Sequence, residues 1–387
     1  MAFRKSTDVR EDIARFMGMT EVRRRLIAEA PDTLPVAEFG VNRLAKALHP
    51  GYLRAEVVAK APAGTDCCRI TLRSLRADGR FPYFRAGQFV ALSAKVGESF
   101  LTRPYSIASS PREALAGTLE VIVQRSGIFS TWLIDEAQPG TQLVVGEPSG
   151  DFHHDSLRDA PHVVAVAGGS GVTPFLSMAK AICEGSEDFR LTLIAGARTR
   201  AKLCFDPEAF HDERVRVVPV LSHEEVPGFR HGFITADVLR EFVDEDTSVF
   251  LCGPDALYSF ARGELAKLGV EPARIRQERN AVGNRAVEEP ATFSLTVRIR
   301  DAVRTIPAST AETLVTAMER AGIAAPVRCK NGSCGFCHSR VIAGEYFVAP
   351  ENDFRRAADR KFGYIHPCCT YPLSDMEIDV PIFEPEE

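Results

Sequence analysis

Five cysteines near the end of the 387-residue chain have spacings that suit an iron-sulfur cluster. Cys329, Cys334 and Cys337 form a C-x4-C-x2-C run, and the adjacent pair Cys368 and Cys369 follows at a distance. Three thiolates on one compact loop and a fourth from a later segment are typical of the ligands of a [2Fe-2S] cluster. Such a loop must bend sharply, and its two glycines permit this. The spacing therefore predicts a [2Fe-2S] centre with Cys329, Cys334 and Cys337 among its ligands.

The same cysteines leave three other interpretations open. Cys334-Gly-Phe-Cys337-His338 matches the C-x-x-C-H pattern of c-type haem attachment, which normally takes place outside the cytoplasm. Zinc usually binds to paired C-x2-C or Cys/His sets, and Cys329 fits neither pattern. Buried thiols without any ligand role are the third alternative.

The region from Thr292 to the end resembles a plant-type ferredoxin domain, which has a β-grasp fold. The stretch Cys368-Cys-Thr-Tyr-Pro372-Leu-Ser-Asp375 is similar to the part of that family that carries the fourth cysteine. The resemblance implies that Cys368 is the fourth ligand and that Cys369 is a neighbour without a ligand role. A shift of one residue in the alignment would exchange the two.

A second motif, Arg103-Pro104-Tyr105-Ser106, has the side chains that a flavin requires. A flat flavin ring takes an aromatic side chain against its face, its phosphates take a guanidinium, and its reactive nitrogen takes a nearby hydroxyl. The motif resembles the Arg-x-Tyr-Ser motif of the ferredoxin-NADP reductase family. That resemblance implies phosphate binding for Arg103, stacking for Tyr105 and a hydrogen bond from Ser106.

Neighbouring stretches keep the order of the same family. Gly87-Gln-Phe-Val precedes the motif, and Gly127-Ile-Phe-Ser130-Thr131 follows it. The resemblance implies that the backbone and hydroxyls of Gly127, Ser130 and Thr131 hold the flavin pyrophosphate at the start of a helix. A second phosphate site favours FAD over FMN.

A glycine-rich turn follows the short apolar strand expected at His162–Ala167. We expect Thr173 to cap the next helix and Pro174 to occupy its first position. The turn lacks the G-x-G-x-x-G spacing, and such turns often serve packing alone. It nevertheless resembles the pyridine-nucleotide loop of the same reductase family, and Cys252-Gly-Pro resembles the family's segment beside the nicotinamide. The implied nucleotide-binding residues are Gly168, Gly169, Ser170, Gly171, Thr173, Pro174, Cys252, Gly253 and Pro254.

The same resemblance implies that Cys252 lies where hydride passes to the flavin, so Ser106 and Cys252 are the expected catalytic residues. The choice between NADH and NADPH stays open. Arg198, Arg200 and Lys202 could bind a 2′-phosphate, but basic residues there more often form a solvated surface, and Glu224 and Glu225 are acidic.

The elements that must position these residues divide the chain into five parts. We expect a helical N-terminal extension at 1–52, an FAD-binding antiparallel β-barrel at 53–155, an NAD(P)-binding doubly wound parallel sheet at 156–275, a polar linker at 276–291 and a ferredoxin domain at 292–387. In the extension, Thr20 is expected to cap one helix, and a second helix is expected from Phe39 to Leu48. Strands of the barrel are expected at Leu53–Ala59, Cys68–Leu72, Gln88–Ala94, Leu119–Gln124 and Gln142–Gly146.

Composition limits the class of protein. Hydrophobic residues at 45% and charged residues at 26% are typical of a globular protein, and a net charge of −5 argues against nucleic-acid or membrane-surface partners. No apolar run is long enough to span a membrane. The first residues lack the apolar core of a signal peptide, so we expect a cytoplasmic protein.

The motifs keep one family's order over roughly residues 53 to 380. The resemblance implies an NAD(P)H oxidoreductase that passes electrons through FAD and a [2Fe-2S] cluster to a redox partner protein such as an oxygenase or desaturase. Two alternatives stay open. One is an electron-transfer subunit like that of dihydroorotate dehydrogenase, although its fourth cysteine follows closely after the third. The other is an iron-sulfur redox sensor without enzyme activity.

Overall fold

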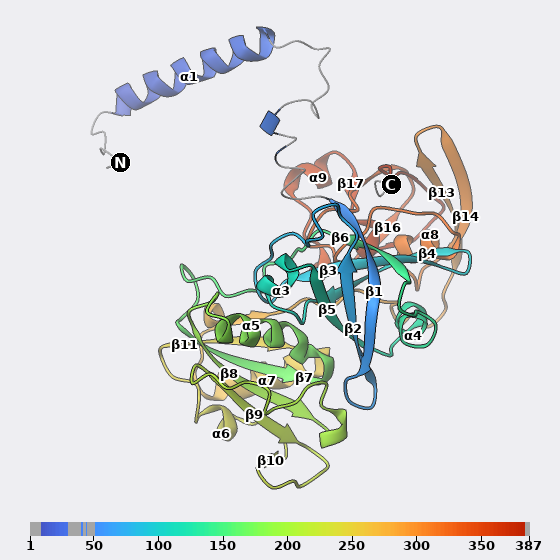
Figure 1. Cartoon of the computed structure of the whole chain (residues 1–387). Helices are drawn as coiled ribbons and strands as arrows, with labels where there is room; N and C mark the ends of the chain where they lie inside the picture. The colour runs from blue at the N-terminus through green and yellow to red at the C-terminus, as the bar shows by residue number, and fades with distance from the viewer. Residues whose placement is uncertain (1–8, 30–39, 42–43, 45–50, 384–387) are drawn as a thin grey trace. The chain divides into compact units, whose positions relative to one another are not determined.

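The computed structural model describes residues 9–29, 40–41, 44 and 51–383, and it divides into units at 1–49 and 50–387 (Figure 1). In the first unit, α1 runs from Val9 to Glu29. Thr20 lies inside this helix and donates its hydroxyl to the Phe16 carbonyl at 2.9 Å. The predicted N-cap at Thr20 is therefore wrong, because the hydroxyl bonds back to the preceding turn. Much of the second expected helix, including Phe39 and Leu48, lies outside the described residues.

The second unit begins with an antiparallel barrel. Its strands are β1 (Tyr52–Pro62), β2 (Cys67–Ser74), β3 (Phe89–Val96), β4 (Ser99–Ser106), β5 (Thr118–Gln124) and β6 (Gln142–Gly146), in the order β4-β3-β6-β1-β2-β5. An isolated bridge between Ile107 and Val121 joins the end of β4 to β5 and closes the sheet. Two short helices accompany it, α3 (Pro111–Leu115) and α4 (Ile128–Asp135).

The barrel confirms the predicted fold class, but one strand escapes the sequence patterns. Strand β4, which carries the flavin motif, contains Pro104. Proline lacks a backbone N–H and is tolerated in a strand mainly at a sheet edge. Strand β4 is the terminal strand of the sheet order, so Pro104 meets this condition.

A parallel sheet follows. It consists of β7 (His162–Gly168), β8 (Arg190–Ala197), β9 (Val215–Leu221), β10 (Arg230–His231), β11 (Thr247–Cys252) and β12 (Ile275–Gln277), in the order β10-β9-β8-β7-β11-β12. Alternate residues of β7 pack into different cores. Val163 and Ala165 pack with α5 (Thr173–Cys183), whereas Val164 and Val166 pack with α6 (Ala236–Leu239) and α7 (Asp255–Lys267). Burial on both faces explains the continuous apolar run and makes the sheet doubly wound.

The ferredoxin domain is a mixed sheet with a helix against it. Its strands are β13 (Thr292–Ile299), β14 (Ala302–Ser309), β15 (Ser339–Ala343), β17 (Tyr364–Ile365) and β19 (Met376–Asp379), in the order β14-β13-β19-β15-β17. A small second sheet pairs β16 (Tyr346–Val348) with β18 (Thr370–Pro372), and α8 (Leu314–Arg320) and α9 (Ala357–Lys361) complete the domain. Thr313 caps α8 by accepting the Thr316 N–H at 3.2 Å.

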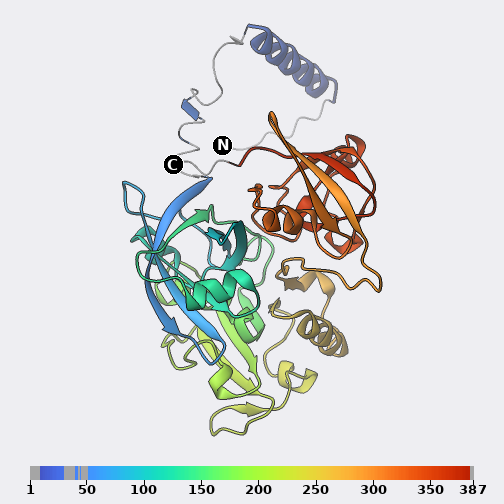
Figure 2. The same ribbon diagram turned by 90° about the vertical axis from the view of Figure 1, so that its right-hand side faces the viewer.

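The segment between the two last domains is partly structured (Figure 2). Arg276 and Gln277, the first residues of the expected linker, belong to β12. The Arg276 guanidinium is buried against Asp159 at 2.5 Å and donates to the His153 carbonyl at 2.8 Å. This ion pair anchors the end of the parallel sheet to the segment after the barrel. Within the described residues, no helix is both long enough and apolar enough to cross a membrane.

Candidate active site

One cavity of about 890 Å³ collects residues from all three sequence motifs. This volume is in the range of cofactor pockets, which run from roughly 300 to 1,000 Å³. Its lining includes Pro104, Tyr105, Ser106, Gly168, Gly169, Ser170, Gly171, Thr173, Cys252, Gly253, Pro254, Cys329 and Asn331. The predicted site residues Arg103, Gly127, Ser130, Thr131, Pro174, Cys334, Cys337 and Cys368 do not line it.

Strand β4 presents the flavin motif to the cavity. The Tyr105 ring lies 6.3 Å from the Phe129 ring, with 31° between their planes. Burial raises the pKa of Tyr105, so its hydroxyl stays neutral. Ser106 ends the strand opposite Phe89. An aromatic face and a hydroxyl on successive residues fit an isoalloxazine ring.

Arg103 has a different environment from the one expected. Its Nη1 donates to Oε1 and Oε2 of Glu319, at 2.8 and 2.9 Å. The same nitrogen donates to the Thr102 carbonyl. Glu319 comes from α8 of the ferredoxin domain and also accepts from Lys330 Nζ at 3.0 Å. Burial lowers the pKa of Lys330, while the Glu319 charge opposes that change. Arg103 thus joins the flavin strand to the cluster loop, and the phosphate role expected for it competes with this ion pair.

The expected phosphate segment lies at the start of α4. The Ser130 hydroxyl accepts the N–H groups of Ser126 and Gly127, both at 2.9 Å, and donates to the Gly127 carbonyl. Thr131 donates its backbone N–H to the same carbonyl at 2.9 Å. Ser130 is therefore occupied in capping the helix, and only Ser126 of this segment lines the cavity.

The glycine turn packs directly against the end of β11. A Cβ on Gly171 would lie 2.2 Å from the Cys252 carbonyl oxygen, so only glycine fits there. Thr173 is the first residue of α5, preceded by Val172 at the N-cap, and its hydroxyl donates to the Ser170 carbonyl at 2.7 Å. The predicted N-cap at Thr173 is thus wrong, and Pro174 is the second helical residue and not the first, because a short 3₁₀ turn runs straight into the helix. Burial raises the pKa of Cys252 and keeps its thiol protonated.

Glu278 lines the cavity, although no pattern in the sequence marks it as a site residue. It follows β12 in the stretch expected to be a linker. Burial raises its pKa to about 7, and the charge of Asp151 acts in the same direction. The Glu278 charge in turn helps to raise the pKa of Cys252. A carboxyl group poised near neutral pH on a cavity wall is a candidate for proton exchange. A polar residue in a polar stretch gives no pattern from which to find it.

The cysteine loop gathers four thiols. The Cys329 thiol lies close to those of Cys334 and Cys368, and the Cys368 thiol lies close to those of Cys337 and Cys369. The Asn331 N–H donates to the Cys329 sulfur and the Phe336 N–H to the Cys334 sulfur, each at 3.5 Å. Hydrogen bonds of this kind to cysteine sulfurs help to set the potential of iron-sulfur clusters. Among the described residues, no three His, Cys, Asp or Glu side chains are arranged for a single metal ion. Three thiols on a glycine-containing loop and a fourth from the turn at Pro367–Cys369 fit a [2Fe-2S] cluster.

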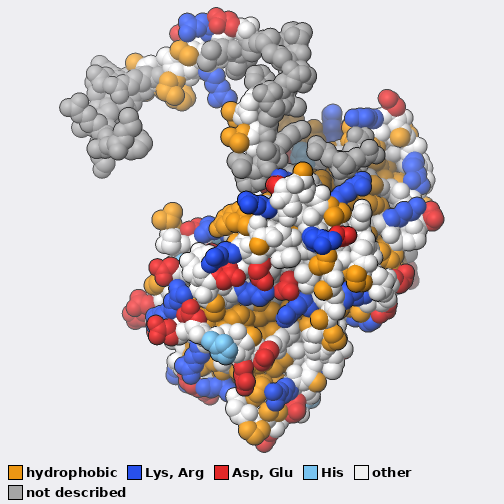
Figure 3. Space-filling view, in the orientation of Figure 1, with side chains coloured by type: hydrophobic (Ala, Val, Ile, Leu, Met, Phe, Trp, Pro, Cys, Tyr) orange, Lys and Arg blue, Asp and Glu red, His pale blue; other side chains and the backbone are white. Residues whose placement is uncertain are grey.

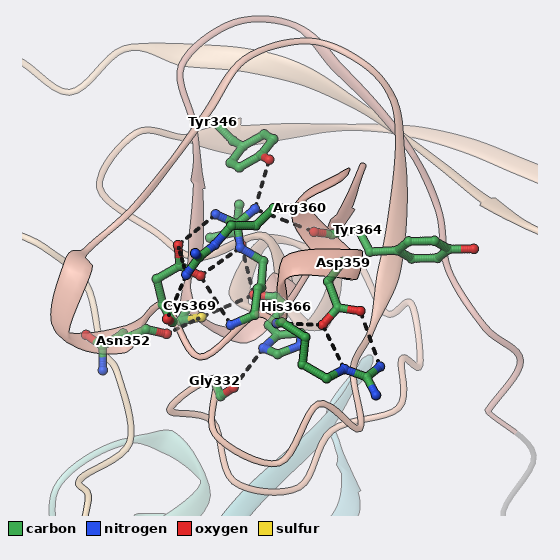
Figure 4. Close-up of polar contacts among 12 residues, drawn as sticks. Gly332, Tyr346, Asn352, Asp359, Arg360, Tyr364, His366 and Cys369 are labelled. Atoms are coloured by element: carbon green, nitrogen blue, oxygen red, sulfur yellow. Dashed lines mark hydrogen bonds and ion pairs between the residues drawn. The ribbon is translucent and has the colours of Figure 1, made fainter. Parts of the chain in front are cut away.

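Cys369 lies behind the loop (Figure 4). Its thiol donates to the carbonyls of Asn352 and His366, at 3.5 and 3.4 Å. His366 Nδ1 lies 2.7 Å from the Gly332 carbonyl, and a Cβ on Gly332, whose φ is +86°, would lie 2.7 Å from the Cys369 sulfur. Cys369 therefore packs against the loop at Gly332, while Cys368 contacts Cys329 and Cys337 as well as Cys369.

The chain matches three family models in the order of its motifs. Residues 55–154 match an oxidoreductase FAD-binding domain, residues 165–263 an oxidoreductase NAD-binding domain, and residues 297–373 a 2Fe-2S iron-sulfur cluster binding domain. These ranges contain the flavin motif, the glycine turn with Cys252, and the cysteine loop.

Relatives cover most of the chain. Phenoxybenzoate dioxygenase subunit beta of Ectopseudomonas oleovorans is 32% identical over 82% of this chain and 93% of its own length. The glycine betaine monooxygenase reductase subunit of Chromohalobacter salexigens is 28% identical over 77% of this chain and 87% of its own length. The solved structure of phthalate dioxygenase reductase matches with a TM-score of 0.62 at 24% identity, over 86% of this chain and 98% of that chain, which shows a shared fold.

Proposed function

The chain belongs to the family of oxidoreductases that combine FAD-binding, NAD-binding and [2Fe-2S]-binding domains, and we propose that it delivers electrons from NADH to an oxygenase. It is an NAD(P)H oxidoreductase that uses FAD and a [2Fe-2S] cluster and passes electrons to a redox partner protein. We propose three further assignments, namely NADH as the donor, an oxygenase as the acceptor, and the roles of individual residues.

The cavity is the observation that supports this proposal most strongly. Tyr105 and Ser106, the turn at Gly171 with Cys252, and Cys329 all line it. A bound flavin can exchange two electrons with a nicotinamide and single electrons with an iron-sulfur cluster. Residues for all three carriers around one cavity would allow transfer without any large movement of the domains.

We assign the following roles to the residues of this chain. Tyr105 supports one face of the flavin ring, and Ser106 donates a hydrogen bond to its reactive edge. The glycine turn would bring its backbone N–H groups to the nucleotide pyrophosphate. Because Gly171 has no Cβ, the turn can pack directly against the Cys252 carbonyl. Cys252, buried and protonated, gives the nicotinamide an apolar contact beside the flavin.

The cluster ligands we propose are Cys329, Cys334, Cys337 and Cys368. Three of them are buried, and only Cys334 is exposed. Cys329 lines the cavity, so electrons would enter on its side. They would leave at Cys334, where an acceptor protein can approach. Positive and negative side chains are interspersed on the face drawn in Figure 3.

An oxygenase is the acceptor class that we propose because the names of the relatives include a dioxygenase subunit and a monooxygenase reductase subunit. The measurement is electron delivery from NADH to a purified oxygenase component under anaerobic conditions. We expect reduction of the oxygenase by the intact chain and none by Cys334→Ser, which should still reduce a two-electron dye. Equal oxygenase reduction by both proteins would contradict an exit through the cluster. If the purified protein oxidised no NADH or NADPH with any dye, the result would favour the alternative of a redox sensor without enzyme activity.

NADH is the proposed donor because two of the three candidate cations, Arg200 and Lys202, are already engaged, which leaves Arg198 on the cavity wall. Lys202 forms an ion pair with Asp66, and the Arg200 guanidinium lies over the Phe229 ring at 5.4 Å. The Arg200 N–H donates to Glu224 at 2.7 Å, so a carboxylate lies where a 2′-phosphate would need positive charge. We expect kcat/KM to be at least about tenfold higher with NADH, which corresponds to about 1.4 kcal/mol. A preference for NADPH would refute this assignment.

We also propose a cytoplasmic location. Ten cysteines, four of them proposed as cluster thiolates, suit a reducing compartment, in which thiols stay available as ligands. Fractionation of the host cells with an antibody to the chain tests this directly, and recovery in an extracytoplasmic fraction would contradict it.

A further inference from the structure

Two cysteines from different domains meet at the cavity wall. Cys67 begins β2 of the barrel, and Cys204 follows the residues 200–202 of the nucleotide domain. The Cys204 thiol donates to the Cys67 sulfur at 3.0 Å. Both side chains are buried from the outer surface, at 8% and 3% exposure, yet both line the cavity. They belong to neither the flavin motif, the glycine turn nor the cysteine loop.

The backbone around this pair is already held in place. The Thr65 N–H donates to the Ala201 carbonyl at 2.9 Å, and Lys202 pairs with Asp66. Gly64, at a φ of +75°, lies so close that a Cβ there would be 2.6 Å from the Leu203 carbonyl oxygen. These contacts fix the barrel turn that precedes Cys67 against the segment that precedes Cys204. A disulfide has a sulfur-sulfur distance of about 2.05 Å, so closure requires a movement of only about 1 Å.

We propose that Cys67 and Cys204 form a redox modification site that hydroperoxides oxidise to a disulfide across the two domains. The Cys67 thiol loses its proton and the thiolate attacks one peroxide oxygen, so a sulfur-oxygen bond forms and the oxygen-oxygen bond breaks. The other oxygen takes up that proton and leaves as water or an alcohol. The Cys204 sulfur then attacks the Cys67 sulfenic acid, a sulfur-sulfur bond forms and water leaves. Two thiols are oxidised to one disulfide, and the peroxide is reduced by two electrons.

The local chemistry supports Cys67 as the attacking thiol. The hydrogen bond from Cys204 is the largest cause and lowers the pKa of Cys67, against the opposing effects of burial and of the Asp66 charge, and the positive charge of Lys202 helps to lower it. Cys67 also lies next to the glycine turn. It pairs across the sheet with Gln124, whose amide oxygen accepts the Ser170 hydroxyl at 2.7 Å. A disulfide here would fix the seam between barrel and nucleotide domain beside the proposed nucleotide site.

The test is peptide mapping of the purified holoprotein after brief treatment with a small excess of hydrogen peroxide. Free thiols are alkylated, and the digest is analysed by mass spectrometry without reduction. We expect a peptide that joins Cys67 to Cys204, with loss of both alkylated thiols and full recovery after dithiothreitol. Cys68→Ser is the matched control, because Cys68 is the adjacent buried thiol and donates to the Arg69 carbonyl instead of another thiol. It should keep the cross-link.

Cys67→Ser and Cys204→Ser should each abolish the cross-linked peptide. The wild-type map is decisive even where a variant does not fold. If Cys67 and Cys204 remain separately alkylated after peroxide treatment, or pair with other cysteines as often as with each other, the proposal is wrong.

Discussion

Both carboxylate oxygens of Glu319 accept hydrogen bonds from the Arg103 guanidinium, at 2.8 and 2.9 Å, although the two residues are 216 positions apart. The Thr102 N–H and the Lys330 ammonium group bond to the same carboxylate. Glu319 is 5% exposed. One buried side chain thus connects the strand of the flavin motif with the loop of the cluster cysteines. Its negative charge is balanced by cations from both sides.

Glu319→Gln should loosen this connection. Glutamine keeps the shape but cannot neutralise Arg103 and Lys330, and an unpaired buried charge costs roughly 3–5 kcal/mol. We expect electron transfer from flavin to cluster to slow by about tenfold or more, because small misplacements at a reacting pair have large effects on rate. Reduction of the flavin by NADH should change little. Anaerobic stopped-flow absorption separates the two phases.

Glu312→Gln is the matched control for that experiment. Glu312 precedes the same helix and pairs with Arg320 inside the ferredoxin domain at 2.7 Å. Its variant should transfer electrons to the cluster at close to the wild-type rate. Hydrogen exchange of β4 in the cofactor-free protein provides a second measurement, and it should rise in Glu319→Gln alone. If Glu319→Gln behaved like Glu312→Gln in both measurements, Glu319 would have no positioning role.

Tyr105→Ala should weaken the binding of FAD. The ring would lose a stacking contact worth about 1 kcal/mol beyond its buried area, so Kd should rise by roughly tenfold. Fluorescence titration of cofactor-free protein measures this. Tyr83→Ala is the control, because that ring is 60% exposed. An unchanged affinity for FAD in Tyr105→Ala would remove the stacking role.

The fourth cluster ligand can be identified by a pair of adjacent variants. Cys368 contacts Cys329 and Cys337 as well as Cys369, whereas the Cys369 thiol donates to the carbonyls of Asn352 and His366. We expect Cys368→Ser to lose the cluster and Cys369→Ser to retain it, measured as iron and sulfide per chain. The reverse pattern would move the ligand to Cys369.

Glu278 should make stability depend on pH. Its pKa is about 7 in the folded chain and 4.5 as a free side chain, so the folded state binds more protons between these values. Its contribution to stability is therefore fully present below about pH 4.5 and is lost as the pH rises through 7, by about 1 kcal/mol per pH unit at most. In Glu278→Gln this loss should disappear.

The measurement is the free energy of unfolding at a series of pH values, compared between wild type and Glu278→Gln. The difference between the two curves isolates this carboxyl from all other titrating groups. Glu271→Gln, at an exposed position before β12, is the control and should follow the wild-type curve. Parallel curves for wild type and Glu278→Gln would show that the carboxyl titrates normally.

The fold class could be predicted from the sequence because its signals are local. Short alternating runs indicated the barrel, and the apolar run of β7 indicated a buried parallel strand. The family models and the shared fold confirm the resemblance to a reductase with FAD, NAD and [2Fe-2S] domains. The five domain boundaries and the individual site residues stay predictions.

Other features depend on contacts between distant segments. Nothing near Arg103 in the sequence points to Glu319, and nothing near Cys67 points to Cys204. Strand β4 was hidden by its proline, and Glu278 by its polar neighbours. Thr20 and Thr173 have the residue type of a helix cap, but both hydroxyls bond to the carbonyl of an earlier residue. Residue type alone does not distinguish a cap from such a bond.

The most direct test of the electron path is anaerobic reduction of the iron-replete holoprotein by NADH, followed by visible absorption and low-temperature EPR. Loss of the oxidised flavin absorbance, then the EPR signal of a reduced [2Fe-2S] cluster, is the predicted result. In Cys334→Ser the flavin should still be reduced and the EPR signal should be absent. A wild-type protein whose flavin is reduced without any cluster signal, or whose cluster is reduced after removal of FAD, would contradict the order from NADH through FAD to the cluster.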